Sequence, residues 1–588
     1  MNRVIRITFV ILCIVVSSFS TEEVIIEATK IPTPLNFVNS SVEILTEQDL
    51  RESGAQFLYD ALISLPGVYG TQNGGPGGTS AVYLRGGKPR YTLILLDGVK
   101  LNDSQDPNGY DLSSFDISNI QRVEILKGPQ SSLYGADAMS GVINIISKKG
   151  SGSSSIGLNL EKGSYGSNKF GLNLSEGTES FYFNFGAHIR DTDGFSHTKT
   201  VLDDDSFLNK TLDINIGGKT PTNSEWNFSS RAISADAEYD SGSFEKNQLI
   251  SSTSFKQHLM NEKITSEISS SYRLFKLFYP GTFAFRSKTE SFGFGWNNII
   301  KFNDNFTILS GIENNREDFG ADYDLEVNSY FIASQFIIND SFNMSLSSRR
   351  DNHAIFDTAD TIQGSFSLLK KNTRIRGSIG TSYLAPNGFQ MSKTDYLEAE
   401  TGSSYEIGID HTFENLDLDF DITFFNNSYK QSIEYVPNTD SYTNYSNAKI
   451  KGFEIGSNLY PSDISSLRIS YTYLDPDADL ENIGFLYRKP NHKINAKYQV
   501  SPNEKLTITS FISYVDSVSD QDSINYNWPG VKVTLADYTL ASINANYKLN
   551  QYTQYYLTIM NVLDEEYETI AGYNVPDLSV YTGIRLSF

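Results

Sequence analysis

The chain has 588 residues, a formal net charge of -23, 39% hydrophobic residues and 13% aromatic residues. Its length exceeds one ordinary hydrophobic core, so we expect either several soluble domains or one very large β architecture. Binding to nucleic-acid phosphates needs clustered Lys and Arg, and the acidic balance therefore excludes nucleic acid as a partner. With 35 Tyr, 37 Phe and 43 Gly against 3 Trp, the composition favours strands and turns.

The first twenty residues have the features of a secretory signal peptide. Arg3 and Arg6 precede an apolar run at 7–16, and small residues at 18 and 20 suit cleavage after residue 20. The only cysteine, Cys13, lies inside that run, so a mature chain without residues 1–20 would contain no thiol. Beyond residue 20 no apolar stretch reaches the roughly 18 residues of a membrane-spanning helix. We expect an exported chain that is periplasmic, secreted or an outer-membrane barrel.

Residues 36–150 mix a helical pattern with short apolar runs and glycine turns. The spacing of the apolar residues predicts a helix from Thr46 to Ser64, with Thr46 as its cap. Three short runs predict strands at Val82–Leu84, Thr92–Leu96 and Val142–Ile146. This segment is therefore expected to be a small α/β domain.

From residue 155 to 588 the chain becomes a long series of segments with period-two alternation, separated by turn residues. The last segment carries Val580, Thr582, Ile584, Leu586 and Phe588 on one face and Tyr581, Gly583, Arg585 and Ser587 on the other. A half-buried soluble sheet also alternates, but at roughly 20 residues per strand and connection the series predicts about 22 strands. Closure into a 22-stranded antiparallel transmembrane β-barrel would hide every edge. A lumen that wide needs a plug.

Four linked motifs lie within the α/β segment. They are LPGVYGTQNGG at Leu65–Gly75, VYLRGG at Val82–Gly87, LILLDGVKLN at Leu93–Asn102 and VEILKGPQSSLYGADAMSGVINIISKK at Val123–Lys149. Their order and spacing resemble the plug domain of TonB-dependent outer-membrane receptors. NVLDEEY at 561–567 and the terminal aromatic Phe588 also resemble this family.

The resemblance implies a domain order. A signal peptide at 1–20 and a TonB box with its linker at 21–35 precede a plug domain at 36–150, which fills a barrel formed by 155–588. The resemblance also implies the outer membrane of a Gram-negative bacterium as the location, with outer-membrane lipid around a monomer. The implied protein partner is TonB with its inner-membrane energising complex.

A short segment ahead of the plug resembles a TonB box. The candidate TonB-binding residues are Glu23, Val24, Ile25, Ile26, Glu27 and Ala28. An extended apolar segment near a chain terminus can add a strand to a partner's sheet, and the backbone hydrogen bonds then give a mechanical grip. Glu27 stands where the family usually has a small polar residue. In isolation, such an apolar run is more often a core strand.

Three charged plug residues are candidates for a latch, namely Arg85, Arg122 and Glu124. Inside a lumen, Arg122 and Glu124 would pair with each other or with carboxylates on the barrel wall, and a desolvated pair is costly to break. Such pairs could hold the plug until force is applied. A solvated surface strand is the alternative interpretation.

Within the family, the chain most resembles cobalamin receptors. The segments that carry this resemblance are TQNGG (71–75), DDDSFLNKTL (203–212), GTSYLAPN (380–387), NAKIKGFE (447–454) and DEEYETIAGY (564–573). It implies Ca²⁺ bound by loop oxygens, with Asp203, Asp205, Tyr239 and Asp240 at the matching positions. Ser196 stands where a further ligand aspartate is expected, so a solvated acidic turn is the alternative.

Ligand contacts are expected at the apices of the plug and in the external loops, where polar and aromatic side chains could hold a large polar ligand. The candidates are Gln72, Asn73, Tyr91, Asn102 and Tyr110. Haem is disfavoured, because the segment from Thr381 to Glu406 contains no histidine.

These observations predict TonB-dependent active transport of a scarce, bulky nutrient, with cobalamin ahead of ferric siderophores. Binding or docking at the cell surface without transport is a second hypothesis. A passive porin is a third, and the plug motifs argue against it. We find no nucleophile paired with a base and no pattern of catalytic zinc ligands, so the chain is not expected to be an enzyme.

Overall fold

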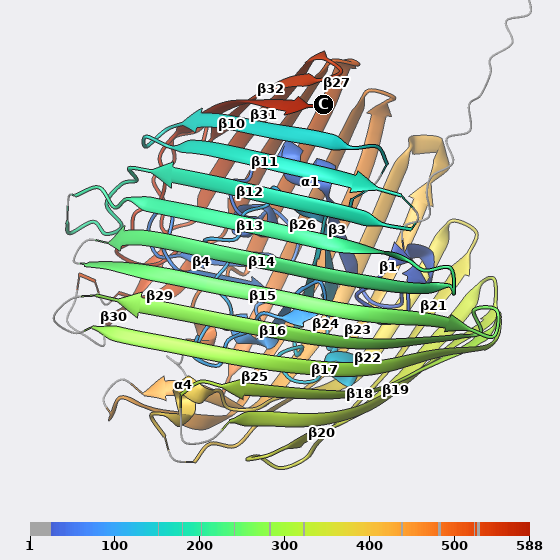
Figure 1. Ribbon diagram of the computed structural model, residues 1–588. Helices are drawn as coiled ribbons and strands as arrows, with labels where there is room; N and C mark the ends of the chain where they lie inside the picture. The colour runs from blue at the N-terminus through green and yellow to red at the C-terminus, as the bar shows by residue number, and fades with distance from the viewer. Residues whose placement is uncertain are drawn as a thin grey trace, which may run out of the picture.

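The computed structural model describes residues 25–588 except 151, 179, 202, 240–241, 281–283, 321–323, 395, 437–438, 480–483, 523 and 526–529. The described residues form a closed barrel of 22 strands, each antiparallel to its neighbours (Figure 1), which confirms the predicted architecture. The predictions for the signal peptide, Glu23, Val24 and Asp240 lie outside the described residues. The barrel strands are β10 (Ser155–Gly163), β11 (Asn168–Gly177), β12 (Tyr182–Thr192), β13 (Phe207–Lys219), β14 (Ser224–Tyr239), β15 (Gly242–Leu259), β16 (Ile264–Tyr279), β17 (Phe285–Asn303), β18 (Phe306–Asp318), β19 (Leu325–Asn339), β20 (Phe342–His353), β21 (Ala359–Lys370), β22 (Thr373–Leu384), β23 (Glu400–Phe413), β24 (Leu418–Val436), β25 (Ser441–Ser462), β26 (Ser465–Ala478), β27 (His492–Asn503), β28 (Leu506–Val515), β31 (Tyr538–Asn550), β32 (Thr553–Met560) and β33 (Ser579–Ser587).

The two ends of the barrel differ in their connections. At one end, hereafter the short-turn end, consecutive strands are joined by tight turns such as 304–305 and 340–341. At the other, the long-loop end, the connection 385–399 carries the helix α4 (Gly388–Met391), and the connection between β28 and β31 carries the hairpin β29 (Val518–Asp522) and β30 (Val531–Leu535). Outer-membrane barrels place their short turns in the periplasm and their long loops outside the cell.

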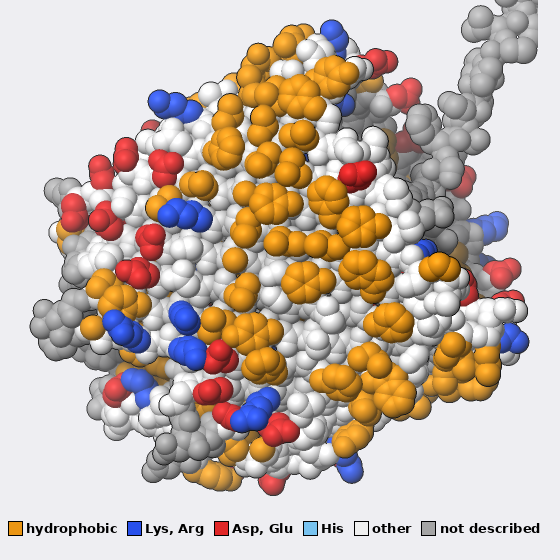
Figure 2. Space-filling view, viewed as in Figure 1, with side chains coloured by type: hydrophobic (Ala, Val, Ile, Leu, Met, Phe, Trp, Pro, Cys, Tyr) orange, Lys and Arg blue, Asp and Glu red, His pale blue; other side chains and the backbone are white. Residues whose placement is uncertain are grey.

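The outer wall carries a belt of apolar side chains. Trp296, Ile312 and Tyr330 are paired across β17, β18 and β19 and are all exposed. Figure 2 shows such side chains as a hydrophobic band that crosses the strands, with most of the visible Lys, Arg, Asp and Glu nearer the two rims. This is the surface that the hydrocarbon core of a bilayer needs. Among the described residues, no helix combines the length and apolar character that crossing a membrane would require.

The plug lies inside the barrel (Figure 1) and is built on a five-stranded sheet with the order β3-β8-β9-β6-β7. Its apolar core continues into the wall, because Ile233, Ile250 and Phe275 belong to the same buried cluster as Leu62 and Ile143. The elements of the plug are β1 (Ile25–Ile26), β2 (Thr33–Pro34), β3 (Val42–Thr46), α1 (Glu47–Ser53), α2 (Leu58–Ile63), β4 (Val68–Gln72), β5 (Ser80–Leu84), β6 (Thr92–Leu96), β7 (Val99–Lys100), β8 (Ile120–Lys127), α3 (Ser131–Tyr134) and β9 (Gly141–Ser147).

The predicted plug strands are confirmed by β5, β6 and β9, but the single helix from Thr46 to Ser64 is wrong. Thr46 does cap α1, accepting a hydrogen bond from the Asp49 amide at 3.1 Å. The helix then ends at Gly54, whose φ of 72° is the left-handed conformation that favours glycine. A second helix, α2, begins at Leu58. The apolar periodicity continues across this break, so the sequence pattern alone predicts one helix instead of two.

An arginine in the apolar belt should destabilise the barrel. Ile312 lies at the middle of β18 with its side chain facing outward, so Ile312→Arg is expected to cost about 2–4 kcal/mol of unfolding free energy, the range for a cation near the bilayer midplane. Denaturant unfolding in lipid vesicles, followed by tryptophan fluorescence, measures this cost. Ile312→Val is the matched control. Equal unfolding midpoints for the two variants would mean that this face does not contact lipid.

Candidate functional site

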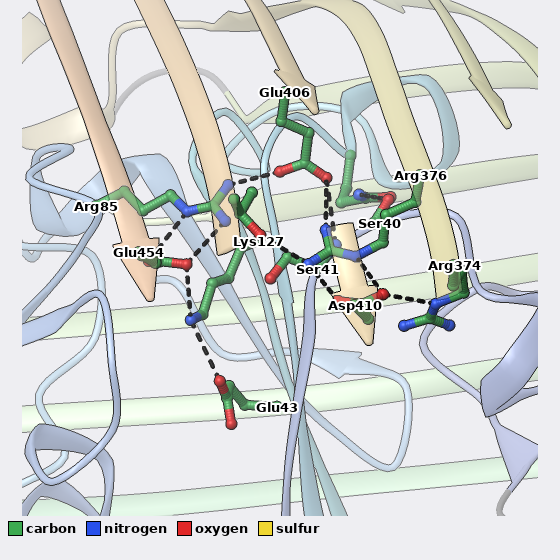
Figure 3. Close-up of polar contacts among 12 residues, drawn as sticks. Ser40, Ser41, Glu43, Arg85, Lys127, Arg374, Arg376, Glu406, Asp410 and Glu454 are labelled. Carbon is green, nitrogen blue, oxygen red and sulfur yellow. Dashed lines mark hydrogen bonds and ion pairs between the residues drawn. The ribbon is translucent and has the colours of Figure 1, made fainter. Parts of the chain in front are cut away.

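Arg85 ties the plug to the barrel wall. It follows β5 with a φ of 49°, and its side chain is buried. Its Nη1 lies 2.6 Å from Oε2 of Glu406 on β23, and its Nη2 lies 2.9 Å from Oε2 of Glu454 on β25. The guanidinium also stacks over the ring of Phe425 at 4.5 Å. Burial opposes the charge, yet the two carboxylates hold the pKa of Arg85 above its ordinary value. Figure 3 shows this arrangement, hereafter the latch.

The latch extends into the plug sheet through Lys127 on β8. Its Nζ lies 3.2 Å from Glu454 and 3.5 Å from Glu43 on β3, and Glu43 in turn pairs with Arg468 of the wall at 2.5 Å (Figure 3 shows the first three residues). Burial works against ionisation of Glu43, but Arg468 and Lys127 keep its pKa below the ordinary value. Gly67 lies beside this group with a φ of 70°, which favours glycine, and a Cβ there would displace the Glu454 carboxylate, whose Oε1 would lie 1.9 Å away.

A second branch of charges lies on the other side of Glu406. Its Oε1 accepts a hydrogen bond from the Ser41 amide at 3.2 Å and lies 3.9 Å from Arg376. Arg376 and Arg374 both pair with Asp410, at 3.3 and 2.7 Å (Figure 3). The wall therefore contacts both the start of β3 and the end of β5. Each buried charge of the latch has an opposite partner, which is the condition for tolerating it.

Arg122 and Glu124 do not reach the wall but pair with each other at 2.8 Å. Their second contact is with the N-terminal segment, since Glu124 Oε2 accepts hydrogen bonds from the amides of Glu27 and Ala28 at 3.0 and 2.8 Å. Arg122 also pairs with the Glu27 side chain at 2.9 Å. Two of the three predicted latch residues therefore hold the predicted TonB box on the plug.

The described part of the box, residues 25–28, is docked rather than free. Ile25 and Ile26 form β1, which pairs with β2 in a two-stranded sheet. Ile26 and Ala28 are fully buried in a small apolar cluster with Val38 and Leu126 of the plug. A partner that adds a strand here has to detach the segment first.

The predicted ligand residues divide into two groups. Gln72 and Asn73 are half-buried at the tip of the β4–β5 hairpin, and the Gln72 side chain donates a hydrogen bond to the carbonyl of Gly75 at 3.0 Å. The other three lie deeper.

Tyr91, Asn102 and Tyr110 are buried and already hydrogen-bonded within the protein. The Tyr91 hydroxyl donates to Glu400 at 2.7 Å, and the Tyr110 hydroxyl donates to Gln248 at 3.0 Å. The Asn102 amide bonds the backbone of β6 at both its oxygen and its nitrogen. These three side chains shape the plug surface from beneath, and their roles as ligand contacts remain predictions.

A cavity of 1140 Å³ separates one side of the plug from the wall. Its lining runs from Asp106 and Asn387 at the long-loop end to Glu27 and His258 at the short-turn end. A second cavity of 760 Å³ lies at the long-loop end, and His353 lines both. Asp106 lines the first cavity, and burial raises the pKa of its carboxyl to about 7.

The described residues of the predicted calcium site differ in their exposure. Asp203 is exposed, whereas Asp205 is buried and accepts a hydrogen bond from the His197 amide at 2.6 Å. Tyr239 ends β14, and Asp240 lies outside the described residues. In the part of the chain that the structure describes, no three His, Cys, Asp or Glu side chains are grouped to hold a metal ion. Calcium binding remains a prediction.

A lipid-embedded barrel, closed by a plug that buried ion pairs latch to its wall, defines a gated receptor of the outer membrane. Residues 34–142 match the family model of the TonB-dependent receptor plug domain, and residues 149–562 match that of the TonB-dependent receptor-like β-barrel. The chain therefore belongs to the TonB-dependent receptor family, whose members reside in the outer membrane of Gram-negative bacteria.

Solved structures share this fold at low sequence identity. The siderophore receptor PirA from Acinetobacter baumannii superposes with a TM-score of 0.81 at 17% identity, covering 94% of this chain and 98% of that one. The ferric enterobactin receptor PfeA from Pseudomonas aeruginosa, in a mutant form bound to enterobactin, gives 0.81 at 17% identity over 93% and 99%. The siderophore receptor PiuA from Acinetobacter baumannii gives 0.79 at 16% identity over 95% and 98%.

The wall partners of the latch are the functional residues that the sequence analysis missed. Glu406 and Glu454 each occupy an inward position on an alternating strand, where a polar residue is expected in any case. Their distances from Arg85 along the chain, 321 and 369 residues, offer no local motif. The NAKIKGFE segment, which ends at Glu454, carries part of the family resemblance but gives no sign of the contact with Arg85.

Removing the cation of the latch should loosen the plug. Arg85→Leu leaves Glu406 and Glu454 buried without their shared partner, which is expected to cost about 3–5 kcal/mol. The loss of unfolding free energy is measured by titrating the purified protein with denaturant and monitoring unfolding of the plug by its susceptibility to proteolysis. Arg350→Leu is the control, because Arg350 forms an exposed pair with Asp360 on the outer wall and should leave the midpoint unchanged. An Arg85→Leu midpoint equal to that of the control would contradict the latch.

Proposed function

We propose that the protein imports a scarce, bulky nutrient across the outer membrane with energy delivered by TonB, and that it catalyses no reaction. The observation that carries this proposal is the placement of residues 25–28 at the short-turn end. They are docked on the plug by contacts that an extended partner strand could replace. A passive pore needs neither a latched plug nor such a segment.

The plug sheet links the docked segment to the latch through one strand. Glu124 and Lys127 both lie on β8, three residues apart; Glu124 binds the backbone of Ala28, and Lys127 binds Glu454 of the wall. When a partner strand replaces these contacts, force along the chain enters the plug at β3, whose Glu43 pairs with Lys127 on β8. In the proposed cycle, TonB adds a strand to residues 23–28 and pulls. The contact between Lys127 and Glu454 then breaks, and the plug yields beside the 1140 Å³ cavity.

The proposed ligand is cobalamin, with a ferric siderophore as the alternative. Cobalamin is supported by the resemblance of segments such as 447–454 and 564–573 to cobalamin receptors. The alternative is supported by the solved structures of similar fold, which are siderophore receptors. Both ligands are bulky and scarce, and both suit a wide lumen that opens through long external loops.

Disabling the N-terminal segment should abolish uptake while sparing binding. Ile26→Pro removes a backbone donor and fixes φ, so the segment can no longer form a regular strand with a partner. Cells that express the variant should bind labelled cyanocobalamin or ferric enterobactin as the unchanged protein does, but accumulate neither inside. Ile26→Val is the control. Normal accumulation by the proline variant would favour docking without transport.

A binding assay separates the two ligands and tests calcium. The purified barrel is titrated with cyanocobalamin and with ferric enterobactin, each with and without Ca²⁺. Binding of cyanocobalamin that strengthens with Ca²⁺ is expected, together with loss of that dependence in the Asp203→Ala and Asp205→Ala double variant. Binding of the siderophore alone would replace cobalamin as the ligand. Equal cyanocobalamin affinity with and without Ca²⁺ would remove the calcium proposal.

A further inference from the structure

The barrel wall splits at the long-loop end between β21 and β22. The ladder that these strands share ends at the pair Gln363 and Gly380. Both strands continue for four more residues, and among the described residues each of these segments pairs only with the strand on its other side, β20 or β23. At the base of the split, the Ile362 amide donates to the side-chain oxygen of Thr381 at 3.0 Å. Two strand edges therefore face a gap in the wall.

One side chain passes through this gap. Tyr383 has the outward register of Ile379 and Thr381 on β22, yet its side chain is buried. Its hydroxyl donates to Asp351 Oδ2 at 2.5 Å. Asp351 lies on the lumen face of β20, where it pairs with Arg349 at 2.8 Å. The ring of Tyr383 therefore fills the split from the outer side of the wall to the inner side.

The cavity of 760 Å³ at the long-loop end lies against the outer side of this split, and we call it the rim pocket. One of its walls is the connection 355–358, and the other is the segment 396–399. Its floor is the outer face of β22, β23 and β24. Its volume falls within the roughly 300–1,000 Å³ of ligand pockets. The floor faces away from the plug, so the pocket meets the surroundings of the barrel.

Hydroxyl groups cover the floor in a regular row. Thr381 pairs across the sheet with Ser403, and Ser403 pairs with Ser428. In the next outward row, Thr401 pairs with Lys430. Hydroxyls can both donate and accept hydrogen bonds, whereas the ammonium group only donates. The floor is therefore suited to a ligand with many polar groups.

The rim pocket begins where the apolar belt ends. Ile362, Ile379 and Tyr405 are exposed on the outer faces of β21, β22 and β23. Two positions further along each strand, about 7 Å, the outward residues line the pocket, and they are Asp360, Thr381 and Ser403. Outer-membrane barrels usually carry aromatic residues at this level, and here a carboxylate and hydroxyls replace them. The pocket therefore opens at the level where lipid headgroups begin.

The wall formed by 396–399 is held in place by its neighbours. Leu397 is buried. The side chain of Asn444 accepts a hydrogen bond from the Glu398 amide at 2.9 Å and donates one to the Glu398 carbonyl at 2.9 Å. Tyr396, which is 77% exposed, is thus presented by an anchored segment. Anchoring lowers the entropic cost of binding a ligand against its ring.

The chemistry of the walls favours a sugar over a phosphate. The rings of Tyr396 and Phe356 offer apolar faces on which the C–H face of a sugar can pack. The carboxylates of Asp357 and Glu398 can accept hydrogen bonds from sugar hydroxyls. Carboxylates also outnumber lysines in the described lining, in which Lys430 provides the ammonium group. A phosphate group would therefore meet net repulsion here.

We propose that the rim pocket binds the sugar headgroup of a glycolipid in the outer leaflet. The acyl chains of this glycolipid lie along the belt below the pocket, against Ile362, Ile379 and Tyr405. The inference goes beyond the proposed import and does not depend on it, because the site is on the outer surface of the wall. It assigns the barrel a specific lipid partner at one place on its circumference.

The test measures binding of a glycolipid to the purified protein. The probe is rough lipopolysaccharide, which has a short sugar headgroup, titrated into the protein in detergent and counted by native mass spectrometry. Tyr396→Ala removes a ring from the wall, and Ser403→Leu replaces a floor hydroxyl with an apolar side chain. Each variant is expected to weaken binding about tenfold.

Two matched controls carry the same substitutions elsewhere on the outer surface. Tyr460→Ala changes an exposed tyrosine at the short-turn end of β25. Ser270→Leu changes an exposed serine on the outer face of β16. Both controls should bind the glycolipid as the unchanged protein does. Equal affinity in the two pocket variants and the two controls would overturn the rim pocket as the site.

Two further probes identify the part of the glycolipid that is bound. The sugar fragment released from the same lipopolysaccharide by mild acid should compete for the site, but more weakly than the intact glycolipid because it lacks acyl chains. Phosphatidylglycerol should not compete. Equal competition by phosphatidylglycerol would mean that the site takes acyl chains regardless of headgroup. A fragment that binds as tightly as the intact glycolipid would make the occupant a free saccharide, and either result would overturn the assignment.

Discussion

Backbone polarity in lipid is the constraint on which the rest of this structure depends. Every peptide N–H and C=O within the hydrocarbon region needs a partner inside the protein, and a sheet meets that demand only when its first and last strands join. Here β10 and β33 pair over residues 157–163 and 581–587 and close the ladder. Closure with 22 strands leaves a lumen wide enough to hold a folded domain. The plug domain fills this lumen.

The same alternation that faces apolar side chains to lipid faces polar ones to the plug. The interface between plug and wall therefore contains buried ion pairs, such as Arg85 with Glu406 and Glu454, beside its apolar contacts. A buried pair adds little net stability over an apolar contact of the same volume, yet losing one partner is costly. This combination suits a domain that has to stay in place at rest and move when force separates specific partners.

The periodicity of the strands and the motifs of the plug could be read directly from the sequence. They predicted the barrel, its 22 strands and three plug strands, because these features repeat or are local. The break at Gly54 escaped prediction because the apolar spacing continues through it. The partners of Arg85 escaped for a different reason: they are set by how strands hundreds of residues away are staggered around the barrel. The alternation of a strand predicts which face of the sheet a charged residue occupies. It does not predict the position of that residue along the barrel axis or the residues that it contacts.

The contacts of the docked N-terminal segment depend on where residues of the plug and the wall lie along the barrel axis. It is held at two points that belong to different bodies, since Glu124 is part of the plug and Glu313 is part of the wall. In the proposed cycle, TonB first detaches residues 25–28 from Glu124; tension in the chain then meets Lys30, and the wall carries the force while Lys30 binds Glu313. The contact between Lys30 and Glu313 has to open before tension passes along the chain to β3, where Glu43 contacts Lys127 of the latch.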